Sequence, residues 1–215
     1  MSTQRSITFF HSPHTRSSCT FFLLEELGIP YDMRVLNMKA GEQRQPAYLA
    51  VNPLGKVPAI RDGDTIVTEQ VAIFIHLADR FPEAGLAPAL DDPRRGAYLR
   101  WLVYYAASFE PALMVRGMQA EPVPAISSPY GDFDAMLGVI EAQLQRGPYL
   151  LGDSISAADL LWGAALGWAM DFGGVPRRPA FVEYAERIAA RPAAKRAAER
   201  DIALIAEHQA ALAPA

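Results

Sequence analysis

The sequence of 215 residues predicts a small α/β domain followed by a larger all-helical domain. Short β-branched and aromatic segments, separated by helical patterns, are confined to about the first 80 residues. Beyond residue 93, apolar residues recur at helical spacing and no segment has a strand pattern. Prolines at 82 and 88, without apolar periodicity, indicate a linker. We therefore expect domains at residues 1–79 and 93–215, joined by residues 80–92.

The first domain is predicted in the order βαβ, then ββα. Its first segment suits a buried strand, and Gly28 is placed to end the helix that follows. Two strands joined by one helix pair in parallel. Asp62-Gly63-Asp64 between two apolar runs is typical of a hairpin. The expected strands are residues 6–10, 31–36, 57–61 and 65–67, and the expected helices lie around 19–27 and 69–79.

The second domain is predicted to contain helices only. The proline-rich segment 121–130 should be a loop between two of them. Ser156 and Asp159 have the spacing of a capping box ahead of an apolar helix, which makes them a folding element rather than a catalytic one. The expected helices are residues 99–118, 133–145, 157–172, 180–190 and 193–211.

Composition and charge exclude several classes of protein. Lys and Arg number 20 against 24 Asp and Glu, so the net charge of −4 argues against nucleic-acid binding. The single cysteine, Cys19, cannot form an internal disulfide. Residues 1–6 are polar, unlike a signal peptide, and the longest apolar run, 160–170, is too short to span a membrane. The sequence therefore predicts a soluble, cytoplasmic protein with no nucleic-acid or membrane partner.

The first candidate site is Ser12-Pro13-His14-Thr15, where a strand gives way to a helix. A helix N-terminus favours an anion or a thiolate, and the Ser12 hydroxyl could donate a hydrogen bond to it. Alternatively, Ser12 or Thr15 simply caps the helix. The residues alone leave both interpretations open.

Two further segments are equally open to two interpretations. A cis Val57–Pro58 bond would expose the backbone of Val57, although trans bonds are the commoner form. Glu69, at the head of a helix, suits the helix dipole and could equally bind an ammonium group. In the second case Gln70 and the helix N–H groups would hold a carboxylate.

Metal and hydrolytic sites are not expected. His11 and His14 lie near Cys19 at a spacing that matches no zinc site. No Gly-x-Ser-x-Gly turn surrounds Ser12, and no glycine-rich phosphate loop is present.

Taken together, these residues resemble the cytosolic glutathione S-transferase superfamily, in particular its serine-type, phi-like or theta-like members. The resemblance covers nearly the whole chain. Its main parts are Asn52-Pro53-Leu54-Gly55-Lys56-Val57-Pro58-Ala59-Ile60, Thr68-Glu69-Gln70-Val71-Ala72-Ile73, Leu24-Glu25-Glu26-Leu27-Gly28, residues 151–159 and Arg191-Pro192-Ala193.

The resemblance implies a thioredoxin-like first domain that binds glutathione as co-substrate, with no permanently bound cofactor. It also implies a homodimer and a detoxifying transfer of the glutathione sulfur to a small apolar electrophile. It implies a cis Val57–Pro58 bond and a Ser12 hydroxyl that holds the thiolate. Arg44 would meet the glycyl carboxylate, since Gln43 replaces the histidine of phi-type members, and Gln70 replaces the usual Ser or Thr. The implied glutathione contacts are Ser12, Arg44, Lys56, Val57, Pro58, Glu69 and Gln70, and the candidates for the electrophile site are Tyr104, Tyr105, Phe109, Met114 and Trp168.

Some alternatives remain at this stage. Thr15, Ser17 or a backbone N–H could be the thiolate donor in place of Ser12. The chain could also be another glutathione-dependent enzyme of this fold, such as an isomerase or dehalogenase, or a binding protein without catalytic activity.

Overall fold

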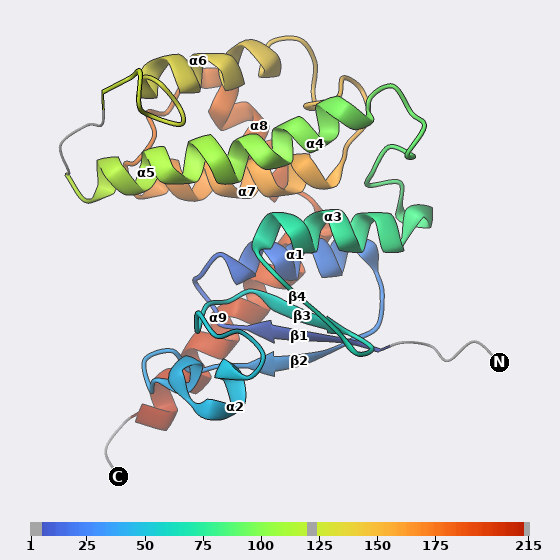
Figure 1. Cartoon of the computed structure of the whole chain (residues 1–215), viewed down its shortest axis with the longest axis vertical. Coiled ribbons are helices and arrows are strands. Elements are labelled where there is room, and N and C mark those ends of the chain that lie inside the picture. Colours follow the sequence, from blue (N-terminus) through green and yellow to red (C-terminus); the bar gives the residue numbers. More distant parts are fainter. Residues whose placement is uncertain (1–5, 120–123, 213–215) are drawn as a thin grey trace. The chain divides into compact units, whose positions relative to one another are not determined.

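A computed structural model describes residues 6–119 and 124–212 of the chain (Figure 1). Residues 1–5, 120–123 and 213–215 lie outside the described residues, and with them the first three residues of the predicted loop 121–130. By its internal contacts the chain divides into two compact units, Met1–Leu77 with Pro192–Ala215, and Ala78–Arg191.

The first unit contains a four-stranded mixed sheet in the order β2-β1-β3-β4. β1 pairs with β2 in parallel, whereas β1 with β3 and β3 with β4 are antiparallel. This is the predicted βαβ-ββα order of a thioredoxin-like domain, and α1 and α3 lie on one side of the sheet (Figure 1). The elements are β1 (Ile7–His11), α1 (Ser17–Leu27), β2 (Tyr31–Val35), a 3₁₀ turn (Glu42–Arg44), α2 (Pro46–Leu49), β3 (Ala59–Asp62), β4 (Thr65–Thr68), α3 (Gln70–Arg80) and α9 (Pro192–Leu212).

The core of this unit forms because each element turns one apolar face toward the sheet. In β1, Ile7 and Phe9 are buried, and α1 contributes Leu23 and Leu24 from its inner face. The sequence missed the short turns and α2 between β2 and β3, since segments of three or four residues show no measurable periodicity.

In its described residues the second unit consists of helices and connecting loops, with an isolated β-bridge between Tyr149 and Gly152 and no strand. Trp162 is the centre of its core: its ring packs on Trp101 and Phe109, and its Nε1–H donates to the Trp101 carbonyl at 2.9 Å. None of the helices in the described ranges has the length and apolar character needed to cross a bilayer. Its elements are a 3₁₀ turn (Pro82–Ala84), α4 (Arg95–Tyr104), a π-helical turn (Tyr105–Phe109), α5 (Glu110–Gly117), α6 (Phe133–Leu144), α7 (Ala157–Asp171) and α8 (Pro179–Ala189).

The predicted helix 99–118 is continuous but changes its hydrogen-bond pattern in the middle. α4 and α5 are joined by the π-helical turn, which ends just before Pro111. Proline has no N–H and its ring displaces the carbonyl one turn earlier, so the local ladder shifts by a residue. A single proline therefore accounts for the irregular turn.

The predicted capping box at the start of α7 is confirmed as a folding element. Asp159 is fully buried and accepts hydrogen bonds from the Leu150 N–H at 2.7 Å, and from the Ser156 N–H and the Tyr184 hydroxyl, each at 2.8 Å. Burial raises the pKa of Asp159 above its ordinary value, while these hydrogen bonds oppose that shift. The carboxyl group thus joins α7, α8 and the preceding loop.

The contacts of α9 place it with the first unit, whereas the sequence boundaries assign residues 93–215 to one domain. Ala193, Ala197 and Leu204 are buried, and their spacing gives α9 one apolar face. That face packs against α1. Periodicity predicted the helix correctly but contains no information about which neighbour its apolar face covers.

The approach of α7 to α8 requires a glycine. A Cβ on Gly163 would lie 2.4 Å from Ile188 Cγ1, whereas one on Gly167, a turn later, would lie 3.7 Å from the nearest atom. We expect Gly163→Ala to lower the free energy of unfolding by about 1–3 kcal/mol. Gly167→Ala should be neutral or stabilising by up to about 1 kcal/mol, because alanine is the better helix former. Urea unfolding of both variants measures the difference, and equal midpoints would contradict the close approach.

Candidate active site

The sheet register gathers the candidate residues of the first unit at one end of the sheet. β1 ends at His11, which pairs with Val35 at the end of β2. Phe10 pairs with Ala59, the first residue of β3, and Ala59 pairs with Thr68, the last residue of β4. The loops that carry Ser12, Arg44, Val57–Pro58 and Glu69 therefore all begin or end at the same end of the sheet.

Ser12 follows β1 directly and is only 4% exposed. Its carbonyl accepts hydrogen bonds from Thr15 Oγ1 at 2.7 Å and Ser17 Oγ at 2.8 Å, and its N–H donates to Ser17 Oγ at 3.0 Å. Within the described chain the Ser12 hydroxyl itself makes no hydrogen bond, so it does not cap α1. The hydroxyls of Thr15 and Ser17 are already engaged within the loop, which leaves Ser12 as the hydroxyl best able to serve a ligand.

A buried chain of hydrogen bonds supports this loop from below. Ser17 Oγ lies 2.9 Å from His11 Nδ1, and His11 Nε2 lies 2.8 Å from Asp201 Oδ1 on α9. His11 and Ser17 are fully buried, and Asp201 is 5% exposed. The order Ser–His–Asp is that of a hydrolytic triad, but a substrate cannot reach a serine without exposed surface. We assign the three residues a structural role in the loop.

The carboxylate of Asp201 is held by several donors besides His11. Ser18 Oγ donates to its second oxygen, and the backbone of His14 also contributes. Burial raises the pKa of Asp201, but the hydrogen bonds from His11 and Ser18 outweigh it and bring the pKa below its ordinary value. Asp201 is therefore ionised at neutral pH and ties α9 to the loop between β1 and α1.

The Val57–Pro58 peptide bond is cis, as the resemblance implies. The Lys56 carbonyl before it accepts hydrogen bonds from the Tyr48 hydroxyl at 2.6 Å and the Asn52 side chain at 2.9 Å. Burial raises the pKa of Tyr48 to about 12, so this hydroxyl keeps its proton. In the described residues the N–H and C=O of Val57 have no hydrogen-bond partner. They are free to pair with an extended peptide.

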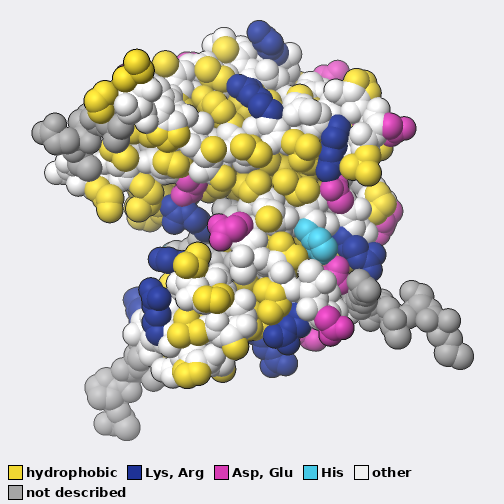
Figure 2. Space-filling view, in the orientation of Figure 1, with side chains coloured by type: hydrophobic (Ala, Val, Ile, Leu, Met, Phe, Trp, Pro, Cys, Tyr) yellow, Lys and Arg dark blue, Asp and Glu magenta, His cyan; other side chains and the backbone are white. Residues whose placement is uncertain are grey.

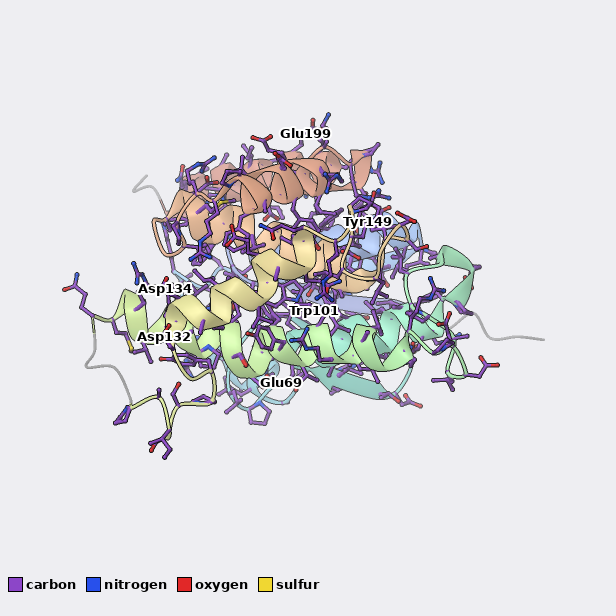
Figure 3. All side chains as sticks on the ribbon, turned by 90° about the horizontal axis from the view of Figure 1, so that it is seen from above. Glu69, Trp101, Asp132, Asp134, Tyr149 and Glu199 are labelled. Atoms are coloured by element: carbon purple, nitrogen blue, oxygen red, sulfur yellow. The ribbon has the colours of Figure 1, made fainter. Side chains whose placement is uncertain are left out.

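Glu69, labelled in Figure 3, lies in the bend between β4 and α3 and is exposed. Its φ of 64° is in the left-handed region, so it precedes α3 rather than forming part of its first turn. Gln70 begins α3, and its Nε2 donates to the Arg16 carbonyl at 2.9 Å. Its Oε1 is buried without a partner among the described residues. Gln70 thus connects the Glu69 bend to the segment that follows Ser12.

The two basic candidates, Arg44 and Lys56, are both exposed. Arg44 ends the 3₁₀ turn, and its Nη1 lies 3.4 Å from the Leu54 carbonyl. Gly55, with a φ of 60°, makes this approach possible, because a Cβ there would lie 2.8 Å from the Gln43 carbonyl oxygen. Both cations therefore remain available to an anionic group.

The five candidates for the electrophile site separate into two groups in the helical unit. Tyr105 and Phe109 are buried against Trp162, and the Tyr104 hydroxyl donates to the Met136 carbonyl at 3.2 Å. Met114 and Trp168 are exposed, and Trp168 stacks on an exposed neighbour, Phe172, with ring centroids 4.7 Å apart. Tyr105 and Phe109 belong to the core, where a stripe at helical spacing most often lies.

Sequence reasoning missed the buried support of the Ser12 loop. One pattern could have revealed it: Asp201 occupies the apolar stripe of α9, between Ala197 and Leu204. A carboxylate at such a position requires a buried partner.

Across residues 6–119 and 124–212, no three His, Cys, Asp or Glu side chains form a group that could hold a metal ion.

The fold and this end of the sheet define a class of protein. The family model of the glutathione S-transferase N-terminal domain matches residues 17–80 of the sequence, and the family model of the C-terminal domain matches residues 130–196. The chain belongs to the glutathione S-transferase family.

Individual relatives agree with this assignment. The chain is 33% identical over 149 residues to Glutathione S-transferase F10 of Arabidopsis thaliana, covering 64% of this chain and 68% of the relative. It is 32% identical to Glutathione S-transferase 3 of Zea mays, over 80% of this chain and 83% of the relative. A glutathione transferase from Methylococcus capsulatus has a structure similar to this one, with a TM-score of 0.77 and 27% identity over 92% of this chain and 99% of its own. A Sulfitobacter homologue with bound glutathione, 28% identical over 92% of this chain and 99% of its own, gives a TM-score of 0.74.

The ionised Asp201 predicts how part of the stability depends on pH. Its pKa is lowered in the fold relative to about 3.9 in the unfolded chain, so its contribution is present above pH ~4 and is lost as the pH falls through the folded value. The unfolding free energies of the wild type and Asp201→Asn should therefore differ at pH 6, and the difference should shrink as the pH falls below about 4. Urea titrations between these pH values measure the difference, and a pH-independent gap would contradict the assignment.

Proposed function

We propose that this protein is a glutathione transferase in which Ser12 stabilises the thiolate of glutathione for attack on a small apolar electrophile. The observation that carries the proposal is the Ser12 hydroxyl, which none of the described residues engages in a hydrogen bond, although the hydroxyls of Thr15 and Ser17 are occupied. It lies at the sheet end where the other candidate glutathione contacts converge. Such an activity would serve detoxification, and the lone cysteine is in keeping with a cytoplasmic location.

The chemistry requires a thiolate. A free thiol with a pKa of about 8.5 is mostly protonated at pH 7, and only its anion is a good nucleophile. A hydroxyl donor and the N-terminus of α1 both favour the charged form, so the thiol proton leaves to solvent. The sulfur then donates an electron pair to an electrophilic carbon, and a leaving group departs with the electrons of the bond that breaks.

The same end of the sheet offers groups for each part of glutathione. The N–H and C=O of Val57 match the backbone of the cysteinyl residue, in the manner of an added strand. The exposed Glu69 carboxylate suits the ammonium of the γ-glutamyl end. The second N–H of Gln70 Nε2, whose first N–H donates to the Arg16 carbonyl, and the α3 N-terminus suit the carboxylate of that end. Arg44 and Lys56 supply positive charge for the glycyl carboxylate.

Removing the Ser12 hydroxyl tests the proposal directly. We expect Ser12→Ala to fold normally, to raise the pKa of the bound glutathione thiol and to lower turnover about 10-fold or more, within the range for a lost oriented donor. Titration of thiolate absorbance with glutathione bound measures the pKa. Cys19→Ala is the control and should retain turnover. Equal thiol pKa values in wild type and Ser12→Ala would refute the role of Ser12.

Glu69 should contribute to affinity rather than to thiolate formation. If it pairs with the γ-glutamyl ammonium, Glu69→Ala weakens glutathione binding by about 1.5–3 kcal/mol. Asp64→Ala is a matched control, because Asp64 is another exposed acid and lies in the hairpin at the opposite end of β3 and β4. Calorimetric titration compares the variants. Unchanged affinity in folded Glu69→Ala would mean that Glu69 only interacts with the dipole of α3 and does not bind glutathione.

We propose that the electrophile is a small apolar molecule. Met114 and Trp168 are exposed apolar side chains of the helical unit and suit a small apolar molecule. Retention on immobilised glutathione together with turnover of a generic electrophile would support the transferase. Binding without turnover would favour a non-enzymatic glutathione-binding protein, and turnover of only an isomerisable or halogenated substrate would favour the other enzymes of this fold.

We also propose a homodimer formed through the exposed side of α4 and α5. Figure 2 shows hydrophobic side chains gathered over these helices on the visible face of their unit. Val103 and Met118 are both exposed there, at a spacing that places them along one stripe. Burial of such a stripe is the usual reason for its presence on a protein surface.

Sedimentation at micromolar concentration should give about twice 23.5 kDa for the wild type. Val103→Glu should shift the protein toward the monomer, because it would bury a charge in the interface. Ile202→Glu is the matched control, since Ile202 is another exposed aliphatic side chain but lies on α9. A wild-type monomer, or the same mass for Val103→Glu as for the wild type, would contradict the proposed interface.

A further inference from the structure

The chain of hydrogen bonds beneath the active-site loop ends at both backbone groups of one residue, Ser12. Ser17 Oγ accepts from the Ser12 N–H at 3.0 Å and lies 2.8 Å from the Ser12 carbonyl oxygen. A residue whose N–H and C=O are both fixed has little freedom in φ and ψ. The direction of the Ser12 Cα–Cβ bond, which carries the hydroxyl, is therefore set by the position of Ser17.

The position of Ser17 is set in turn by His11. The Ser17 oxygen lies 2.9 Å from His11 Nδ1, and the His11 ring is packed between Phe9 and Phe21, with centroid distances of 5.2 and 5.4 Å. On its other side, His11 Nε2 is 2.8 Å from Asp201 Oδ1. The ring is fully buried, so its two nitrogens depend on these two partners.

Donors and acceptors can be assigned along this series of hydrogen bonds whether the His11 ring is neutral or charged. Ser17 has one hydroxyl proton and three neighbouring acceptors: the Ser12 carbonyl, His11 Nδ1 and the Thr15 hydroxyl oxygen. With a neutral ring, Nε2–H donates to Asp201, Nδ1 accepts from Ser17, and Thr15 alone serves the Ser12 carbonyl. With a charged ring, both nitrogens donate, and the Ser17 proton returns to the Ser12 carbonyl. In both states the Ser12 N–H remains on Ser17.

We infer that His11 and Asp201 are positioning residues, which orient the Ser12 hydroxyl toward the glutathione thiolate through Ser17. The inference rests on the proposed function of Ser12 and extends it to α9, from which no side chain was a candidate for the site. Neither residue touches the substrate. Their effect on the reaction is transmitted through the backbone of Ser12.

The experiment compares Asp201→Asn with Glu199→Gln. Glu199, labelled in Figure 3, is an exposed acid two residues earlier on α9, so the control makes the same chemical change on the same helix. Asp201→Asn should raise the pKa of the bound glutathione thiol by about one unit, which reduces the thiolate fraction below that pKa about tenfold. The KM for glutathione should stay within about twofold, because the groups proposed to bind glutathione are unchanged. Glu199→Gln should match the wild type in both.

Two variants of His11 test the route. The shorter amide of His11→Asn can replace Nδ1 and keep the hydrogen bond with Ser17, but it loses the one with Asp201. The longer amide of His11→Gln can replace Nε2 and keep the hydrogen bond with Asp201, but it loses the one with Ser17. Because each breaks the chain at one point, both should raise the thiol pKa as Asp201→Asn does. Ser18→Ala removes a hydrogen-bond donor to Asp201 that is not part of the series from Asp201 through His11 and Ser17 to Ser12. It should therefore lower thermal stability and leave the thiol pKa unchanged. Should Asp201→Asn fail to fold, the His11 variants decide the question by the same titration.

A double-mutant cycle separates the inference from the proposed function. If Asp201 acts through Ser12, then Asp201→Asn has no further effect on the thiol pKa once Ser12 is alanine. Additive effects, or a wild-type thiol pKa in folded Asp201→Asn and both His11 variants, would overturn the inference while leaving Ser12 in place. An unchanged thiol pKa in Ser12→Ala alone would overturn the proposed function itself, and the inference with it.

Discussion

The antiparallel pairing of β1 with β3 is the constraint on which the rest of the active site depends. It places the end of one strand beside the beginning of the other, so that a hydroxyl and a free peptide backbone meet although about 45 residues separate them. The parallel partner β2 and the hairpin strand β4 then bring a basic and an acidic loop to the same edge. A shift of one residue in this register would move the buried side chains of β1 to the opposite face of the sheet.

The support beneath that edge is polar, which is unusual for the interior of such a small unit. Apolar residues around His11 hold the ring in place but satisfy neither nitrogen. The cost of burying the imidazole and the Asp201 carboxylate is offset by the hydrogen bond between them, by that between Ser17 and the ring, and by that from Ser18 to the carboxylate. Hydrogen bonds also fix direction, which packing alone does less sharply, and direction is what an active-site hydroxyl requires.

The sequence predicted most of the fold because its strands and longer helices have strong periodicity. β4 and α7 agree with expectation to within one residue at each end. The capping box at Asp159 was equally clear, since both of its partners are close in sequence. The site was only partly predictable: the resemblance supplied Ser12 and Glu69, but three hydroxyls within six residues could not be ranked without their hydrogen bonds. The partnership of His11 with Asp201 spans 190 residues, and no local pattern contains it.

That separation also determines when the site can be completed during synthesis. At about 5–20 residues per second, the ribosome adds the residues between His11 and Asp201 in roughly 10–40 seconds. The sheet and its loops can pair in that interval, but the carboxylate that anchors the Ser12 loop arrives among the last residues of the described chain. The nascent protein thus possesses the loops proposed to bind glutathione before it possesses the side chain that supports them, and the whole helical unit is made in between.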